Sequence, residues 1–208
     1  MSEPEIADNS SRPADTESDP PIIRGVLIGV IASVVVAVAM FAWVTAGGGE
    51  SVRTELDAYA GPSRAIEGRL SYPGVTAYFP YRPAVVRQLP LPMIDRLVES
   101  GDLHGAAVAH LLMVQTEQAR PYLEQAAPST ELFNDRAAAL LIAGDAVGAE
   151  RALVMLDRVL TDVSDHGPAL WNRALALAAL GRTDEAAVVF DVIAGRGEAG
   201  WSEEAAER

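Results

Sequence analysis

The longest apolar stretch of the chain covers residues 25–46 and contains neither a charged residue nor a proline. In α-helical geometry these 22 residues extend about 33 Å, which is enough to cross the hydrocarbon core of a bilayer. A helix on the surface of a soluble core keeps a polar face for water, and this stretch has no such polar stripe. The pattern therefore predicts a single N-terminal transmembrane helix.

The residues flanking this span favour a retained anchor over a cleaved signal peptide. A signal peptide has a basic segment and a shorter apolar run, whereas residues 1–24 hold six acidic and two basic residues. The alternative stays open, because residues 44–46 also fit a signal-peptidase site. Arg24 abuts the span and the next arginine is Arg53, so the positive-inside rule favours a cytoplasmic N-terminus. We expect a single-pass membrane protein whose C-terminal domain lies outside the cytoplasm, in the periplasm.

Small residues recur at every fourth position within the span, at Gly25, Gly29, Ser33 and Ala37. Such a stripe lets two membrane helices approach closely, where packing drives their association. It favours a homodimer through the transmembrane helix. The alternative is a plain anchor, since alanine and glycine are frequent along the whole chain.

The segments on either side of the span differ in character. Residues 1–24 are rich in Ser, Pro, Asp and Glu and are expected to form a disordered acidic tail. Residues 47–92 are predicted to be a linker and capping segment, in which Ser63 begins a short helix that ends at Leu70. Prolines interrupt residues 72–92, and this pattern predicts a loop.

Residues 93–208 carry a repeating helical pattern, with apolar positions at i, i+3, i+4 and i+7 between Gly, Asp, Ser or Pro breaks. Two units match at an offset of 37 residues. The matched pairs are Phe133 and Leu170, Ala137 and Ala174, Leu140 and Leu177, Gly144 and Gly181, Ala149 and Ala186, Leu153 and Phe190, and Leu156 and Ile193. A weaker earlier unit has Ala107, Ala119, Leu123 and Ala126, with Val114 at the position where glycine is expected. The pattern predicts about three helix pairs.

This spacing resembles the tetratricopeptide repeat (TPR) family, whose repeat is about 34 residues long. The residues that carry the resemblance are Asn172, Ala174, Leu177, Gly181, Ala186 and Phe190, echoed by Ala137, Leu140, Gly144, Ala149 and Leu153. Residues 169–190 and 200–208 also resemble the degenerate helical-repeat segment found before the protease domain of some bacterial CHAT-domain proteins. The resemblance implies an all-α fold of TPR-like helical hairpin repeats, an α-solenoid, behind the transmembrane helix. It carries over no catalytic role, because it covers only the repeat segment.

Charge and candidate chemistry narrow the function further. The net charge of −13 and the pI near 4.6 argue against binding to nucleic acid or to anionic lipid headgroups. The chain has no cysteine, and its histidines, His104, His110 and His166, form no i, i+4 pair that suits zinc. Neither a Gly-rich phosphate loop nor a G-x-S-x-G elbow is present. We expect a protein that is not an enzyme and needs no cofactor or metal.

Stacked helix pairs form a curved surface that holds protein or peptide partners. The predicted function is therefore a membrane-anchored, non-catalytic interaction or scaffold module. The TPR resemblance places partner contacts on the first helix of each pair, which implies Asn134, Leu141, Trp171, Asn172 and Leu175 as partner-binding residues. In the competing interpretation Trp171 packs only against the next repeat and Asn172 bonds only to nearby backbone. Two other functions stay open: an envelope regulatory or sensor protein, and the non-catalytic repeat part of a CHAT-protease-type system.

Overall fold

The computed structural model describes residue 56, residues 62–86 and residues 88–208, all within the compact unit Thr45–Arg208. In this part of the chain all the regular secondary-structure elements are α-helices. The only β-type pairing there is an isolated parallel bridge between Arg64 and Tyr81. The prediction of an all-α fold is confirmed for these residues. The predicted tail, the apolar span and its small-residue stripe lie outside the described residues. No helix within the described ranges is both long enough and apolar enough to cross a membrane.

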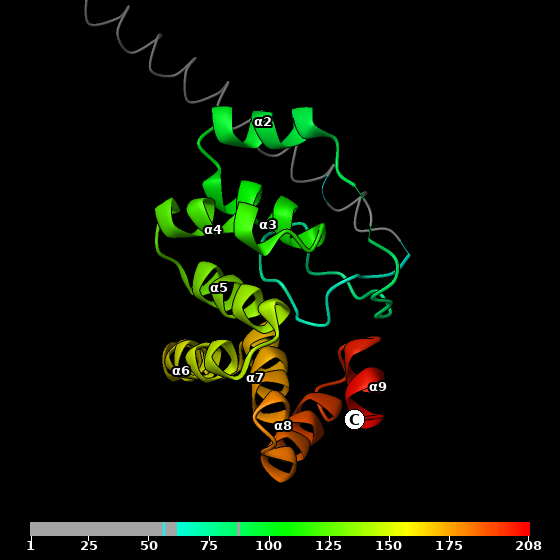
Figure 1. The fold of residues 1–208 in the computed structure, drawn as a ribbon. Coiled ribbons are helices and arrows are strands. Elements are labelled where there is room, and N and C mark those ends of the chain that lie inside the picture. The colour runs from blue at the N-terminus through cyan, green and yellow to red at the C-terminus, as the bar shows by residue number, and fades with distance from the viewer. Residues whose placement is uncertain (1–55, 57–61, 87) are drawn as a thin grey trace, which may run out of the picture. The chain divides into compact units, whose positions relative to one another are not determined.

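Three helical hairpins form the body of the described domain, with one further helix at each end (Figure 1). The helices are α2 (Leu91–Glu99), α3 (Leu103–Leu112), α4 (Thr116–Gln125), α5 (Thr130–Ala143), α6 (Ala146–Asp162), α7 (Gly167–Ala179), α8 (Thr183–Ala194) and α9 (Trp201–Ala206). Helix α3 pairs with α4, α5 with α6, and α7 with α8. The first helices α3, α5 and α7 contact one another in chain order, and α6 packs on both α5 and α7. This arrangement is compatible with an α-solenoid.

The turn inside each hairpin uses one residue with left-handed backbone geometry. Gly144 has φ +77° and Gly181 has φ +73°, where glycine has no Cβ to clash. Val114 occupies the same place in the first hairpin with φ +59°, and it is the only non-glycine residue with positive φ among the described residues. In the repeat pattern Val114 stands at the position where glycine is expected. The left-handed backbone conformation of the turn therefore recurs in all three hairpins, although the residue type differs in the first.

The positions that match in sequence are also the positions that pack. Ala137 and Ala174 are fully buried, and Ala149 and Ala186 are 2% and 3% exposed. These small side chains let neighbouring helices approach closely, and large apolar side chains fill the space around them. The buried residues form two clusters, one centred on α2, α3 and α4 and the other on α6, α7, α8 and α9, which meet at α5.

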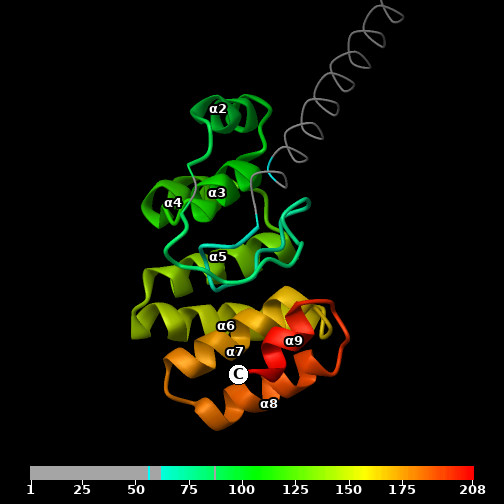
Figure 2. The ribbon, with the colours of Figure 1, turned by 90° about the vertical axis from the view of Figure 1, so that its right-hand side faces the viewer.

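The short helix predicted from Ser63 to Leu70 is absent. Residues 63–72, hereafter the strap, form no helix and lie against the first helices of the hairpins (Figure 2). Side-chain amides from α5 and α7 bind the strap main chain, so its backbone groups do not need helical partners. The loop expected at residues 72–92 contains no helix up to Pro90 among the described residues, but it ends two residues early, because α2 begins at Leu91.

Candidate functional site

The strap crosses the first helices in reverse chain order, from the last hairpin to the first. Glu67 and Arg69 are bound by α7, Ser71 by α5, and Tyr72 reaches the start of α3. The side chains that bind it come from the N-terminal parts of successive first helices, so the strap meets each of these helices in turn. This is the face on which the sequence predicted partner contacts.

Two asparagines hold the strap through its main chain. Asn172 accepts a hydrogen bond from the Arg69 N–H at 2.7 Å and donates to the Arg69 carbonyl at 2.8 Å, so one amide satisfies both backbone groups of one residue. Asn134 donates to the same carbonyl at 2.9 Å, and its Oδ1 accepts from Asn172 Nδ2 at 2.9 Å. Both asparagines are fully buried. Asn134 also donates to the Ser71 hydroxyl at 2.7 Å. At Arg69 the two amides bind only backbone atoms, so there they do not select for a particular side chain.

Asp135 extends this polar network toward the first hairpin. Its buried carboxylate accepts from the Ser71 N–H at 2.7 Å and lies 2.8 Å from His104 Nε2 on α3. The Tyr72 hydroxyl then donates to Asp102 at 2.5 Å, next to Gly105. A Cβ on Gly105 would lie 2.6 Å from the Tyr72 hydroxyl oxygen, so only glycine leaves room for this ring.

The five predicted partner-binding residues fall into two groups. Asn134, Trp171 and Asn172 lie fully buried beneath the strap, and Trp171 Nε1 donates to the Glu67 carbonyl at 3.0 Å. Leu141 and Leu175 instead line a groove beside the strap. The first group therefore contacts an extended segment of its own chain.

The groove beside the strap has a volume of about 430 Å³. One wall is strap residues 65–68 and the other is formed by α5 and α7. Its apolar lining from the helices consists of Leu141, Ile142, Leu175, Ala178 and Ala179. An ion pair between Glu67 and Arg208 stands at its edge.

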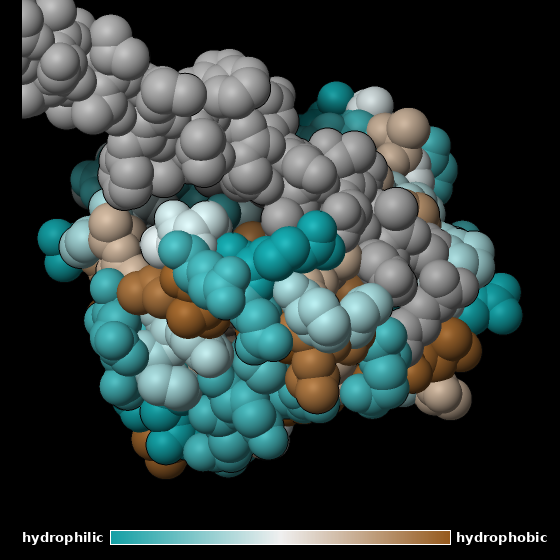
Figure 3. Space-filling view, turned by 90° about the horizontal axis from the view of Figure 1, so that it is seen from above, coloured by the Kyte–Doolittle hydropathy of each residue, from teal (hydrophilic) through white to brown (hydrophobic). Residues whose placement is uncertain are grey.

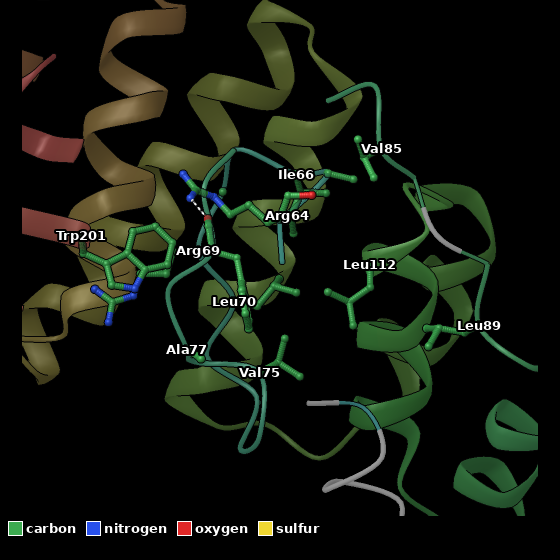
Figure 4. A pocket seen from close by; sticks show the side chains of 14 residues that line it. Arg64, Ile66, Arg69, Leu70, Val75, Ala77, Val85, Leu89, Leu112 and Trp201 are labelled. Carbon is green, nitrogen blue, oxygen red and sulfur yellow. Dashed lines mark hydrogen bonds between the residues drawn. The ribbon is translucent and has the colours of Figure 1, made fainter. Parts of the chain in front are cut away.

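At the other end of the strap, two arginines pack on the C-terminal helix. The guanidinium carbons of Arg64 and Arg69 each lie 4.6 Å from the Trp201 ring centre (Figure 4). Arg64 also pairs with Glu204 at 2.6 Å, and Arg69 with Glu198 at 2.6 Å. We call these five residues the arginine–tryptophan cluster. Cation–π contacts and ion pairs together fix the register of the strap against α9.

Burial has opposite consequences for the two kinds of charge in this cluster. It lowers the pKa of the Arg69 guanidinium, and the pairing with Glu198 only partly opposes this effect. Burial raises the pKa of Glu198, but hydrogen bonds from Arg196 and Arg69 outweigh it and leave that pKa below its ordinary value. Glu204 behaves in the same way, with Arg64 as the main donor. The acidic partners therefore stay ionised opposite the two arginines.

A small cavity of about 50 Å³ lies between the strap and the loop that follows it. Leu70, Val75 and Leu112 point toward one another across it, away from the arginine–tryptophan cluster (Figure 4). Arg64, Arg69 and Trp201 line its other side. Its size suits packing rather than the binding of a drug-sized molecule. The outer surface seen from above is mostly hydrophilic, with separate apolar patches (Figure 3).

Within the described ranges, no three His, Asp or Glu side chains gather in an arrangement that could hold a metal ion. The sequence reasoning missed Arg64, Arg69, Asp135 and the role of Trp201. Asp135 was detectable in principle, since it stands 37 residues before Asn172 in the matched register. No protein-family model and no curated protein matches the chain.

Proposed function

We propose that residues 93–208 form a non-catalytic, TPR-like protein-interaction module, held at a membrane by the apolar span at residues 25–46. Its partner-binding surface is the face formed by α3, α5 and α7, together with the groove beside the strap. The module works as a scaffold or adaptor that holds an extended segment of a partner protein close to the membrane.

One observation carries this proposal: the amide of Asn172 binds both the N–H and the carbonyl of a single strap residue, Arg69. A side chain placed in this way recognises extended peptide backbone. Asn134 and Asp135 continue the same recognition one helix further along. The face is therefore built to hold an extended chain, and the groove of about 430 Å³ leaves part of it open.

Site-specific photo-crosslinking in intact cells tests the proposal. A photoreactive residue at Leu141, in the groove, should give a small number of defined adducts with another protein. The same residue at Val188, which is 64% exposed on α8, serves as the control and should not give them. Ala178→Glu places a charge at an exposed position of the groove and should remove the Leu141 adducts. Identical adducts from Leu141 and Val188 would contradict a partner site in the groove.

A further inference from the structure

The two halves of the strap are held in different ways. Leu70 and Tyr72 are 3% and 1% exposed and belong to the first hydrophobic cluster. In residues 63–69, Ile66 packs in the same cluster, and the main chain of Glu67 and Arg69 is bound by side chains of α5 and α7. Arg64 and Arg69 make ion pairs with Glu204 and Glu198 and pack on Trp201. Arg64 also shares two backbone hydrogen bonds with the loop after the strap, through Pro80 and Arg82. The second half is thus mainly apolar core, whereas polar contacts hold most of the first half.

The fit of the first half is incomplete. Within the described ranges, the buried side-chain nitrogen and oxygen atoms that make no hydrogen bond all belong to Arg64, Arg69, Trp201 and Glu204. A buried polar atom without a partner costs free energy that a solvated one does not. Arg69 Nη1 is among these atoms, although it lies 2.6 Å from Glu198 in an ion pair. Among buried side-chain atoms of the described residues, these costs therefore fall at the contact between residues 63–69 and α9.

The chemistry of the site defines what else can occupy it. Within residues 63–69 the asparagine amides bind only main chain, at Arg69, so another extended segment can replace residues 63–69 there. Side-chain selection comes from Trp201, Glu198 and Glu204, which together accept two arginines. The net charge of −13 on the whole chain adds a long-range preference for a basic partner.

We propose that residues 63–69 are an intramolecular substitute for an arginine-bearing extended segment of a partner protein, which binds by displacing them while residues 70–72 stay in the core. The partner segment carries two arginines separated by four residues, as Arg64 and Arg69 are. This inference rests on the proposed function, because it names the partner class and the regulation of the same face. A tethered competitor has an effective concentration of about the millimolar range, so the unperturbed chain binds a free peptide weakly.

Gly68 offers a way to loosen the strap without changing the face beneath it. A Cβ on Gly68 would lie 3.2 Å from Asn172 Oδ1 and 3.5 Å from the Ala138 Cβ. Gly68→Val therefore pushes residues 63–69 away from α5 and α7 while every side chain of those helices stays the same. Ala84→Val is the matched control, because Ala84 is exposed in the loop after the strap.

The probe is a fluorescent peptide with the sequence of residues 61–70, GPSRAIEGRL, and its binding to the full chain in detergent is followed by anisotropy. We expect Gly68→Val to bind it at least tenfold more tightly than the wild type and Ala84→Val do. A peptide with both arginines replaced by glutamine should lose at least tenfold in affinity for Gly68→Val. Equal affinity for the two peptides, or no binding to a folded Gly68→Val chain, overturns the inference.

Hydrogen exchange on the wild-type chain gives a second test that needs no folded variant. The Arg69 amide hydrogen should exchange much faster than the amide hydrogens of α5 and α7, because residues 63–69 open without the rest of the domain. Exchange of Arg69 at the rate of those helices would mean that the segment leaves only on global unfolding, and this overturns the inference.

These results are separable from those on the proposed function. If the Leu141 adducts form but no arginine-selective binding is found, the interaction module stands and the displacement mechanism fails. If arginine-selective binding is found but no adducts form, the site and its preference stand and the groove is not the partner surface in cells.

Discussion

Asn172 Nδ2 lies 2.9 Å from Asn134 Oδ1, and both side chains donate to the carbonyl of Arg69. The two asparagines stand on different hairpins, so a single residue of the strap joins α5 to α7. The pair is fully buried, and neither amide has water as an alternative partner. Loss of one amide therefore leaves main-chain groups buried without partners.

Asn172→Ala should lower the free energy of unfolding by about 2–4 kcal/mol. The buried Arg69 N–H loses its acceptor, and the Arg69 carbonyl and Asn134 Oδ1 each lose the hydrogen bond that Asn172 Nδ2 donates. Urea unfolding monitored by circular dichroism measures this loss. Arg173→Ala, one residue further along α7, removes only a half-exposed pair with Asp157 and should cost less than about 1 kcal/mol. A comparable loss from both substitutions would contradict the bridging role of Asn172.

Val114→Gly should raise the free energy of unfolding by about 1 kcal/mol, because a β-branched residue at φ +59° is strained and glycine is not. Val163→Gly is a close control, since Val163 is 38% exposed and Val114 is 39% exposed. Val163 directly follows α6, and Val114 is the second residue after α3. Val163 has φ −137°, so glycine there relieves no strain and should destabilise. Thermal midpoints of the two variants should move in opposite directions; a common direction would mean that the turn strain is negligible.

Ala174→Leu should lower the free energy of unfolding by about 1–3 kcal/mol, because Ala174 is fully buried between closely approaching helices. Ala178→Leu on the same helix, at an exposed position, is the control and should change little. Denaturant midpoints measure both variants. An unchanged midpoint for Ala174→Leu would argue against tight packing at the matched repeat positions.

The stability of the domain should fall as the pH drops below about 6.5. His166 Nδ1 accepts a hydrogen bond from the Ala169 N–H and so caps α7 in its neutral form. Burial lowers the pKa of His166 from its ordinary value of 6.5, despite the opposing charges of Glu131 and Asp135. Below pH 6.5 the unfolded chain therefore takes up a proton that the folded chain resists, and the loss continues until the pH passes the folded pKa.

His166→Asn keeps an acceptor at the cap without a titrating group. Its urea midpoint should match the wild type at pH 7.5 and exceed it at pH 5.5. The lowered pKa values of Glu131, Glu198 and Glu204 affect stability only near and below 4.5, outside this window. Parallel pH dependence in the two proteins would assign the effect to another group.

Reporter fusions after Arg208 test the predicted membrane topology. A reporter that is active only outside the cytoplasm should be active, and a cytoplasmic reporter silent, because Arg24 lies at the start of the span and is expected to stay inside. The chain should also remain in the membrane after a carbonate wash. Release by carbonate, or a mature N-terminus near residue 47, would contradict a retained anchor.

The sequence predicted the features of the fold that depend on local periodicity. The small residues Ala137 and Ala174 and the turn at Val114 all follow from the spacing of apolar and small positions, and each lies where that spacing placed it. Residues 63–70 were predicted as a helix because Ser63 can act as a helix N-cap. The actual partners of the strap stand 64 to 104 residues away, at Asp135, Asn172 and Trp171, and no local pattern reports such pairing.

The TPR resemblance pointed to the first-helix face, including Asn134 and Asn172, as the place of partner contacts, and this assignment stays a prediction. The resemblance gave no indication that a segment of the same chain would cover that face. This covering depends on the cation–π contacts of Arg64 and Arg69 with Trp201, which are distant in sequence.

The ion pair between Arg64 and Glu204 joins residues 140 positions apart and brings the two ends of the described domain together. An open repeat array can begin folding at any unit and grow from there, because each unit contacts only its neighbours. Here the segment that leaves the ribosome first acquires its full set of contacts only after Trp201 and Glu204 have been synthesised. Residues 63–69 therefore gain their last contacts after the hairpins have formed, although they are synthesised before them. A truncation that removes α9 would also destabilise the packing of residues 63–69.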